Sequence, residues 1–312
     1  MTTLLTFRDS VKAFFGRYDF IFTPLFKGVI AYIIFLSLNS QFGYFALLDN
    51  RSLIIMLAII CAFLPSEVIT AIGGLMIALQ SFKVSIDVGL LSVAVILIFY
   101  CAYMRFSTKT GIIVLLVPLC FSLHLTYAIP IIVGFLVGPA AIIPVIFGFI
   151  LYYYEQSLSE LVKVLAAATE DDEAVSGFQY VINGMISNKE MFLIFVVSAL
   201  VILITYAIYR LSFEHSWVAS FIAGGFFNVV LYLAGNVLIL VDIDLASVVT
   251  GSVIGIVLAL IIQFFKGIVD YQRTEILQFE DNEYYYYVKA VPKLYVSESN
   301  KNVKKINSNT GK

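Results

Sequence analysis

Long apolar segments separated by short polar ones recur along most of the chain. A helix crosses the roughly 30 Å hydrocarbon core of a bilayer with about 20 residues, and several segments reach that length. Because the apolar runs are continuous and do not alternate with polar residues, they predict helices and not the strands of a membrane barrel. We therefore expect an all-α polytopic membrane bundle of about eight spans, with spans 1–5 in residues 20–154 and spans 6–8 in residues 190–268.

The apolar segment at residues 52–82 is interrupted at its centre by polar residues. Pro65 lacks the N–H that would continue a helix, and Ser66 can cap a new half-helix that holds Glu67 at its positive N-terminal end. An acidic residue inside a bilayer costs about 2.5–3.5 kcal/mol, so we expect this carboxylate to face protein or water. These three residues predict a transport site; the alternative is a half-helix that its own carboxylate caps, without any substrate.

Helix-breaking residues are dense in this segment and in the apolar residues 111–154, where we expect two spans that turn near residues 126–128. In a membrane, broken helices are tolerated where neighbouring protein satisfies the exposed backbone groups. We therefore expect kinked or discontinuous helices that are buried in the bundle. The expected helix breaks are Gly73, Gly74, Pro130, Gly134 and Pro139.

Three polar segments flank or interrupt the predicted spans. Residues 1–19 predict an amphipathic interfacial helix, with a leader helix packed on the protein as the alternative. Residues 155–189 predict two short amphipathic helices on the membrane surface, packed on the edge of the bundle, with docking of a partner as the alternative. Residues 269–312 predict a cytoplasmic tail, in which the tyrosines of residues 279–293 have strand character. The tyrosines that we expect to bind the sheet edge of a partner, or else to lie at the membrane interface, are Tyr284, Tyr285, Tyr286 and Tyr287.

Two apolar segments share a pattern. Residues 96–107 and 202–212 both read Ile-Leu-Ile-x-Tyr-x-x-Tyr and then Arg-x-Ser. Each is followed by two further apolar spans, so we expect two copies of a three-span unit, inverted relative to each other because three is an odd number. The alternative is chance similarity between isoleucine-rich helices.

Composition agrees with a membrane protein. Of the 312 residues, 61% are hydrophobic and 13% are charged, which leaves too few polar side chains to cover a soluble domain. The net charge of −2 is too small to indicate a nucleic-acid partner. The tail from Lys266 onward holds eight of the 19 Lys and Arg residues, which predicts a multi-pass cell-membrane protein with both termini in the cytoplasm.

Catalytic motifs are missing from the sequence. It contains no G-x-x-x-x-G-K-[ST] loop, no H-E-x-x-H and no G-x-S-x-G, so we expect no enzyme activity and no cofactor. Two histidines are too few for a His-rich metal site, and we expect no metal. His124, inside an apolar run, is a further candidate transport residue; the alternative is a neutral histidine with an ordinary hydrogen bond.

A family resemblance rests on residues 279–293, on Tyr-Met-Arg-Phe-Ser at 103–107 and on Ala-Ile-Pro-Ile-Ile-Val-Gly at 128–134. Together these segments resemble bacterial multi-span membrane proteins labelled as permease-like components of ATP-binding-cassette transporters. The resemblance implies a permease-like subunit whose ATPase is a separate chain, although the Glu-Ala-Ala-x-x-x-Gly coupling loop of import permeases is missing. The alternatives are a non-catalytic scaffold of an envelope or secretion assembly and a self-contained secondary carrier. The expected partners are the lipid bilayer and either an ATP-binding subunit or envelope proteins, and the chain can also form oligomers.

Overall fold

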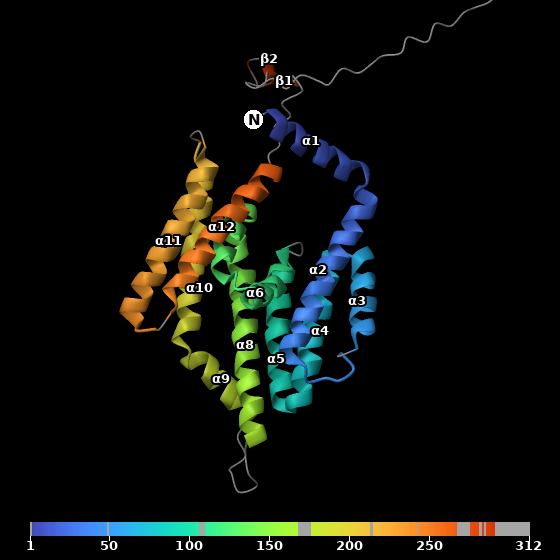
Figure 1. The fold of residues 1–312 in the computed structure, drawn as a ribbon, viewed down its shortest axis with the longest axis vertical. Helices are drawn as coiled ribbons and strands as arrows, with labels where there is room; N and C mark the ends of the chain where they lie inside the picture. The colour runs from blue at the N-terminus through green and yellow to red at the C-terminus, as the bar shows by residue number, and fades with distance from the viewer. Residues whose placement is uncertain are drawn as a thin grey trace, which may run out of the picture. The chain divides into compact units, whose positions relative to one another are not determined.

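The computed structural model describes residues 2–48, 50–105, 110–167, 176–212, 215–241, 243–266, 275–280, 283 and 285–290. These residues fold into helices and one two-stranded hairpin, so the predicted all-α helical bundle is confirmed (Figure 1). Among them, seven helices are long and apolar enough to cross a membrane, and the protein is a multi-pass membrane protein. The chain divides into a bundle of residues 19–262 and a terminal unit of residues 1–18 and 263–312.

The helices of the bundle follow one another along the chain with short connections. They are α2 (Asp19–Phe42), α3 (Arg51–Phe63), α4 (Ser66–Val84), α5 (Ile86–Phe99), the π-helical turn η1 (Tyr100–Met104), α6 (Ile113–Ser122), the 3-10 turn η3 (Thr126–Ala128), α7 (Ile129–Leu136), the 3-10 turn η4 (Pro139–Ala141), α8 (Ile142–Ala167), α9 (Gly177–Ser187), α10 (Lys189–Tyr209), α11 (Ser216–Ile239) and α12 (Leu245–Lys266).

The break predicted within residues 52–82 is confirmed, since α3 ends at Phe63 and α4 begins at Ser66. Leu64 has an extended backbone (ψ 165°), as the clash between a proline ring and a helical residue before it requires. The predicted capping role of Ser66 is wrong. Ser66 is already the first helical residue, and Pro65 occupies the cap position without a side-chain hydrogen bond.

Residues 111–154 do not form two full spans. Helix α6 has 10 residues and α7 has 8, so each is roughly 12–15 Å long, about half of the hydrocarbon core. The turn predicted near residues 126–128 is present as η3, and it leads into α7. The next helix, α8, continues for 26 residues, so the boundary expected at residue 155 lies inside a helix. The first of the two expected surface helices is therefore the second half of α8.

The predicted helix breaks separate into two kinds. Pro130 is the second residue of α7 and Pro139 begins η4, so both prolines lie at helix starts. The three glycines lie inside helices instead: Gly73, Gly74 and Gly134. A Cβ at Gly134 would lie 3.2 Å from the backbone oxygen of Ile202, so this glycine lets α7 approach α10 closely.

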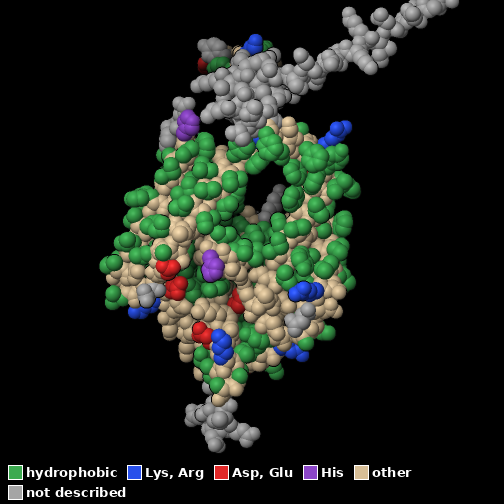
Figure 2. All heavy atoms as spheres, viewed as in Figure 1, with side chains coloured by type: hydrophobic (Ala, Val, Ile, Leu, Met, Phe, Trp, Pro, Cys, Tyr) green, Lys and Arg blue, Asp and Glu red, His purple; other side chains and the backbone are tan. Residues whose placement is uncertain are grey.

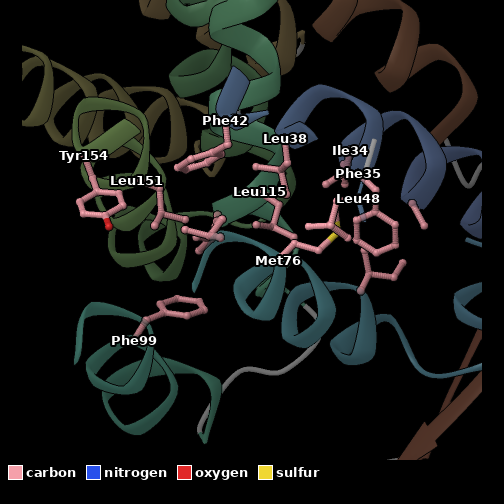
Figure 3. Packing of buried hydrophobic residues seen from close by; sticks show 14 of the residues in the cluster. Ile34, Phe35, Leu38, Phe42, Leu48, Met76, Phe99, Leu115, Leu151 and Tyr154 are labelled. Carbon is pink, nitrogen blue, oxygen red and sulfur yellow. The ribbon is translucent and has the colours of Figure 1, made fainter. Parts of the chain in front are cut away.

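Two apolar cores fill the bundle, and α8 contributes to both. The first core packs α8 with α2, α3, α4 and α5, and the second packs it with α7, α10, α11 and α12. Leu151, Tyr154 and Leu158 belong to the first core, whereas Phe149 and Tyr153 belong to the second. Figure 3 shows Tyr154 and Leu151 on one side of the first core, across from the side chains of α2. Helix α8 is therefore held on two faces, which fixes the position of the polar residues on its remaining face.

The two segments that share a sequence pattern both end a helix. The first continues from α5 into η1, where the N–H of Arg105 donates to the carbonyl of Tyr100 at 3.3 Å. The second ends α10, which stays α-helical to Tyr209. Phe106 and Ser107 of the first segment lie outside the described residues, and the inverted repeat stays a prediction.

The terminal unit contains α1 (Thr2–Arg17) and an antiparallel hairpin of β1 (Glu275–Glu280) and β2 (Tyr285–Ala290). The strand character predicted for residues 279–293 is confirmed for β2, in which Tyr287 lies opposite Gln278. Tyr284 lies outside the described residues. The interfacial position of α1 and the cytoplasmic side of both termini stay predictions.

Candidate functional site

The residues predicted as a transport site lie on different elements. Pro65, Ser66 and Glu67 lie at the start of α4, where Glu67 is half-buried and interacts electrostatically with Tyr100 of η1. His124 lies between α6 and η3, with an exposed side chain and a left-handed backbone (φ 55°). The predicted transport residues therefore lie at two separate places in the bundle.

A small cavity lies one helical turn from Glu67. Thr70 and Tyr100 are among the residues that line it, and their buried hydroxyls have no hydrogen-bond partner among the described residues. The cavity measures about 20 Å³ and its other walls are apolar. Such a volume is too small for a solute.

A larger pocket with polar walls lies where α2, α6 and α8 meet, and we call it the polar pocket. Its volume is about 390 Å³, within the usual range for small-molecule sites. It is lined by Gln41, Phe121, Ser122, Tyr152, Glu155, Gln156, Ser159, Glu160 and Lys163. On the displayed face of the bundle, acidic side chains gather in the lower half, below a broad hydrophobic area (Figure 2). By contrast, a groove of about 690 Å³ between α2 and α3 has apolar walls, as expected of a surface that faces lipid.

Glu155 is the most deeply buried ionisable side chain in the wall of the polar pocket, with 8% of its surface exposed. It lies near the middle of α8, far from the free backbone N–H groups at the helix start. In the amide orientation that satisfies its partners, the side-chain nitrogen of Gln41 lies 2.5 and 2.6 Å from the two carboxylate oxygens of Glu155. The amide oxygen of Gln41 then accepts hydrogen bonds from the hydroxyls of Ser122 and Ser37. An uncharged network therefore holds a buried carboxylate at the pocket wall.

Aromatic rings form another part of this wall. The rings of Phe121 and Tyr152 stack with centroids 3.6 Å apart and an interplanar angle of 11°. Tyr152 interacts electrostatically with Glu155 and also with Glu190, which lies in the first turn of α10. Stacked rings next to carboxylates form an environment that attracts cations.

Glu190 is surrounded by further tyrosines. It interacts electrostatically with Tyr127, Tyr153 and Tyr232, and the rings of Tyr127 and Tyr232 meet edge to face at 5.0 Å. Its position at a helix N-terminus gives it a structural role as well, because the helix dipole stabilises an anion there. Among the described residues, no group of three His, Cys, Asp or Glu side chains is arranged to hold a metal ion.

Sequence reasoning did not select Glu155 because this residue was assigned to the start of a polar insertion. The sequence nevertheless contains a helical pattern that extends across Glu155. Leu151, Tyr154, Leu158 and Leu161 recur at helical spacing across the supposed boundary, and all four are buried. That continuous stripe places Glu155 inside a packed helix.

Comparison with known proteins finds no matching family model, no matching curated protein and no matching solved structure. Function is therefore inferred from the polar pocket and the helices that build it.

Proposed function

We propose that this membrane protein is the permease-like component of a transporter and that its solute binds in the polar pocket. The observation that carries the proposal is Glu155, an acidic side chain with 8% exposure at the point where the apolar first half of α8 meets its more polar second half. Its hydrogen-bond partner within the described structure is an uncharged amide, that of Gln41. Ionisable residues inside membrane helices are costly, and they commonly mark the path of a substrate or ion.

Discontinuous helices next to the pocket support the same function. Helix α6 ends at Ser122 after 10 residues, and this last residue both lines the pocket and accompanies Gln41 in the hydrogen-bond network. Half-length helices whose ends approach a substrate site are a recurrent feature of transporters, where the freed backbone groups line a cavity. The half-length α7 follows in the chain, so the pocket adjoins an interrupted part of the bundle.

An energy source on a separate chain belongs to this proposal, because the sequence has no phosphate-binding loop of its own. Purification of the tagged protein from native membranes in mild detergent, followed by mass spectrometry, tests this part. We expect a stoichiometric ATP-binding subunit. A protein that purifies alone yet transports its solute would replace this arrangement with a self-contained carrier.

The site itself is tested with solute profiles of cells. A deletion strain and its parent are compared for accumulated or excreted polar metabolites, and the deletion is complemented with wild type, Glu155→Gln or Asp87→Asn. Asp87 is an exposed carboxylate in the first turn of α5, so its amide variant is the matched control. We expect wild type and Asp87→Asn to restore the profile and Glu155→Gln to fail at equal abundance in the membrane. Full complementation by Glu155→Gln would exclude the proposed site, and Glu67→Gln in the same assay tests the site predicted at α4.

A second candidate function, a scaffold for an envelope or secretion assembly, is favoured by the hairpin. An isolated two-stranded hairpin is marginally stable in water. Tyr285 and Tyr287 of β2 are about 70% exposed, so their rings are free to pack against another protein. Deletion of residues 275–312 would release the envelope proteins that co-purify with a scaffold, whereas unchanged co-purification would argue against this function.

A further inference from the structure

Charge is distributed unevenly in the polar pocket. Two carboxylates, Glu155 and Glu160, and one ammonium group, Lys163, lie in its wall. Glu155 is buried, whereas Glu160 and Lys163 are exposed. Lys163 follows Glu155 by eight residues on α8, a rise of about 12 Å, so the buried end of the pocket holds an acidic group and the ammonium group lies toward solvent.

The elements packed around Glu155 add no positive charge at this end. From α2, Gln41 and Ser37 contribute an amide and a hydroxyl, and from α6, Ser122 contributes a hydroxyl. Helix α10 contributes a second acidic side chain, Glu190, which interacts electrostatically with Tyr152 as Glu155 does. Lys189 precedes it in α10, but its side chain is exposed to solvent.

The aromatic rings in the wall of the polar pocket favour organic cations among the ligands that a carboxylate attracts. A flat ring stack such as Phe121 on Tyr152 offers an electron-rich face to an alkylammonium or guanidinium group. A volume of about 390 Å³ is also far larger than a bare ion needs.

We infer that the polar pocket binds a small organic cation, with its ammonium group between the carboxylate of Glu155 and the ring of Tyr152. The inference rests on the proposed function and names the class of solute. The amide of Gln41 occupies the carboxylate when the pocket holds no cation, and the ligand takes over this contact when it binds. The remaining polar groups of the solute then form hydrogen bonds with the hydroxyl and amide groups of Ser122, Gln156 and Ser159.

Thermal unfolding of the detergent-purified protein tests the inference with defined probes. Tetramethylammonium, choline and ethanolammonium chlorides are compared with sodium chloride at equal ionic strength. We expect at least one of these cations, at saturation, to raise the unfolding temperature by about 2–4 °C. The shift should vanish in Glu155→Gln and persist in Asp87→Asn.

A second comparison on the wild-type protein keeps the test valid if Glu155→Gln does not fold. Choline is compared with 3,3-dimethyl-1-butanol, which has nearly the same shape and no charge. A shift for choline without a shift for the alcohol supports the inference, and equal shifts overturn it.

The absence of a shift with all three ammonium compounds also overturns it. If a neutral or anionic solute depends on Glu155 for transport in cells, the proposed function stands and the cationic class is wrong. If Glu155→Gln complements fully, the proposed function fails as well.

Discussion

Tyr154→Phe should destabilise the bundle because it removes a buried hydroxyl that links three helices. Tyr154 is 1% exposed, and its O–H reaches the hydroxyl oxygen of Ser81 on α4 at 2.8 Å and the carbonyl oxygen of Val88 on α5 at 3.1 Å. The hydroxyl of Ser81 donates to the carbonyl of Ile77 at 2.8 Å, so Ser81 accepts from Tyr154 and does not donate to it. The two acceptors share the single proton of the Tyr154 hydroxyl, and the variant removes it from both.

Two average hydrogen-bond energies bound the expected loss in the free energy of unfolding. A buried polar group that loses its partner costs about 1–3 kcal/mol, whereas interhelical hydrogen bonds in membrane proteins average about 0.6 kcal/mol. Because one hydroxyl of Tyr154 serves acceptors on two helices, we expect the free energy of unfolding to fall by about 1–2 kcal/mol. The phenyl ring of the variant fills the same space, so no cavity adds to this value.

Reversible unfolding by SDS in mixed micelles, followed by far-ultraviolet circular dichroism, measures the difference. The matched control is Tyr153→Phe, since Tyr153 is adjacent on α8 and 2% exposed. Its hydroxyl approaches the carboxylate of Glu190 without hydrogen-bond geometry, so we expect this variant to stay within about 0.5 kcal/mol of wild type. Equal losses in the two variants would refute the reasoning, because ring burial and not hydrogen bonding would then hold α8 in place.

Two further predictions concern α12. Gly255→Ala places a Cβ 2.9 Å from the Cα of Ala128 in η3, so it should lower the free energy of unfolding by about 1–3 kcal/mol in the same SDS titration. Gly16→Ala, where an added Cβ meets nothing within 4 Å, should be neutral, and equal effects of the two variants would contradict the packing argument. Asp244 accepts hydrogen bonds from the hydroxyl of Ser247 and from a backbone N–H at the start of α12, and these bonds hold the pKa of its carboxyl below the usual value. The carboxylate therefore stabilises α12 at neutral pH, and this contribution is lost as the pH falls through the lowered pKa. Asp244→Asn should unfold at a lower temperature than wild type at pH 7, and the difference should shrink below about pH 4; a difference independent of pH would contradict the assignment.

Apolar length and proline chemistry made much of this fold predictable. The long helices α2, α10, α11 and α12 lie where continuous apolar runs predicted them, because such runs specify a membrane helix locally. The break at Pro65 was predictable for the same reason, since a proline acts on the residue before it. The half-length helices α6 and α7 could not be predicted. Their ends depend on which neighbouring segment satisfies the freed backbone groups, and that segment is distant in the sequence.

The polar pocket could not be predicted as a unit. Gln41 and Glu155 belong to helices that are far apart in the sequence, and no local pattern pairs an amide with a carboxylate. The sequence instead favoured Glu67, because an acidic residue after a proline looks isolated in an apolar run. In the structure Glu67 lies in the first turn of α4, where a carboxylate is usual.

Glu155 is the stronger candidate because its position differs from that of the other acidic residues. Glu67, Glu190 and Asp244 all lie at the start of a helix, where free N–H groups and the dipole stabilise an anion by about 0.3–1 kcal/mol. Glu155 lies 13 residues into α8 and has no such support. The hydrogen bond from Gln41 to a charged group is worth about 1.5–3 kcal/mol, which only about balances the 2.5–3.5 kcal/mol cost of an acidic residue in a membrane helix. A leucine or a glutamine would fill the same position without that cost, so burial alone does not account for an acidic side chain there. A positively charged ligand would account for it, because it supplies the one interaction that the surrounding helices leave out.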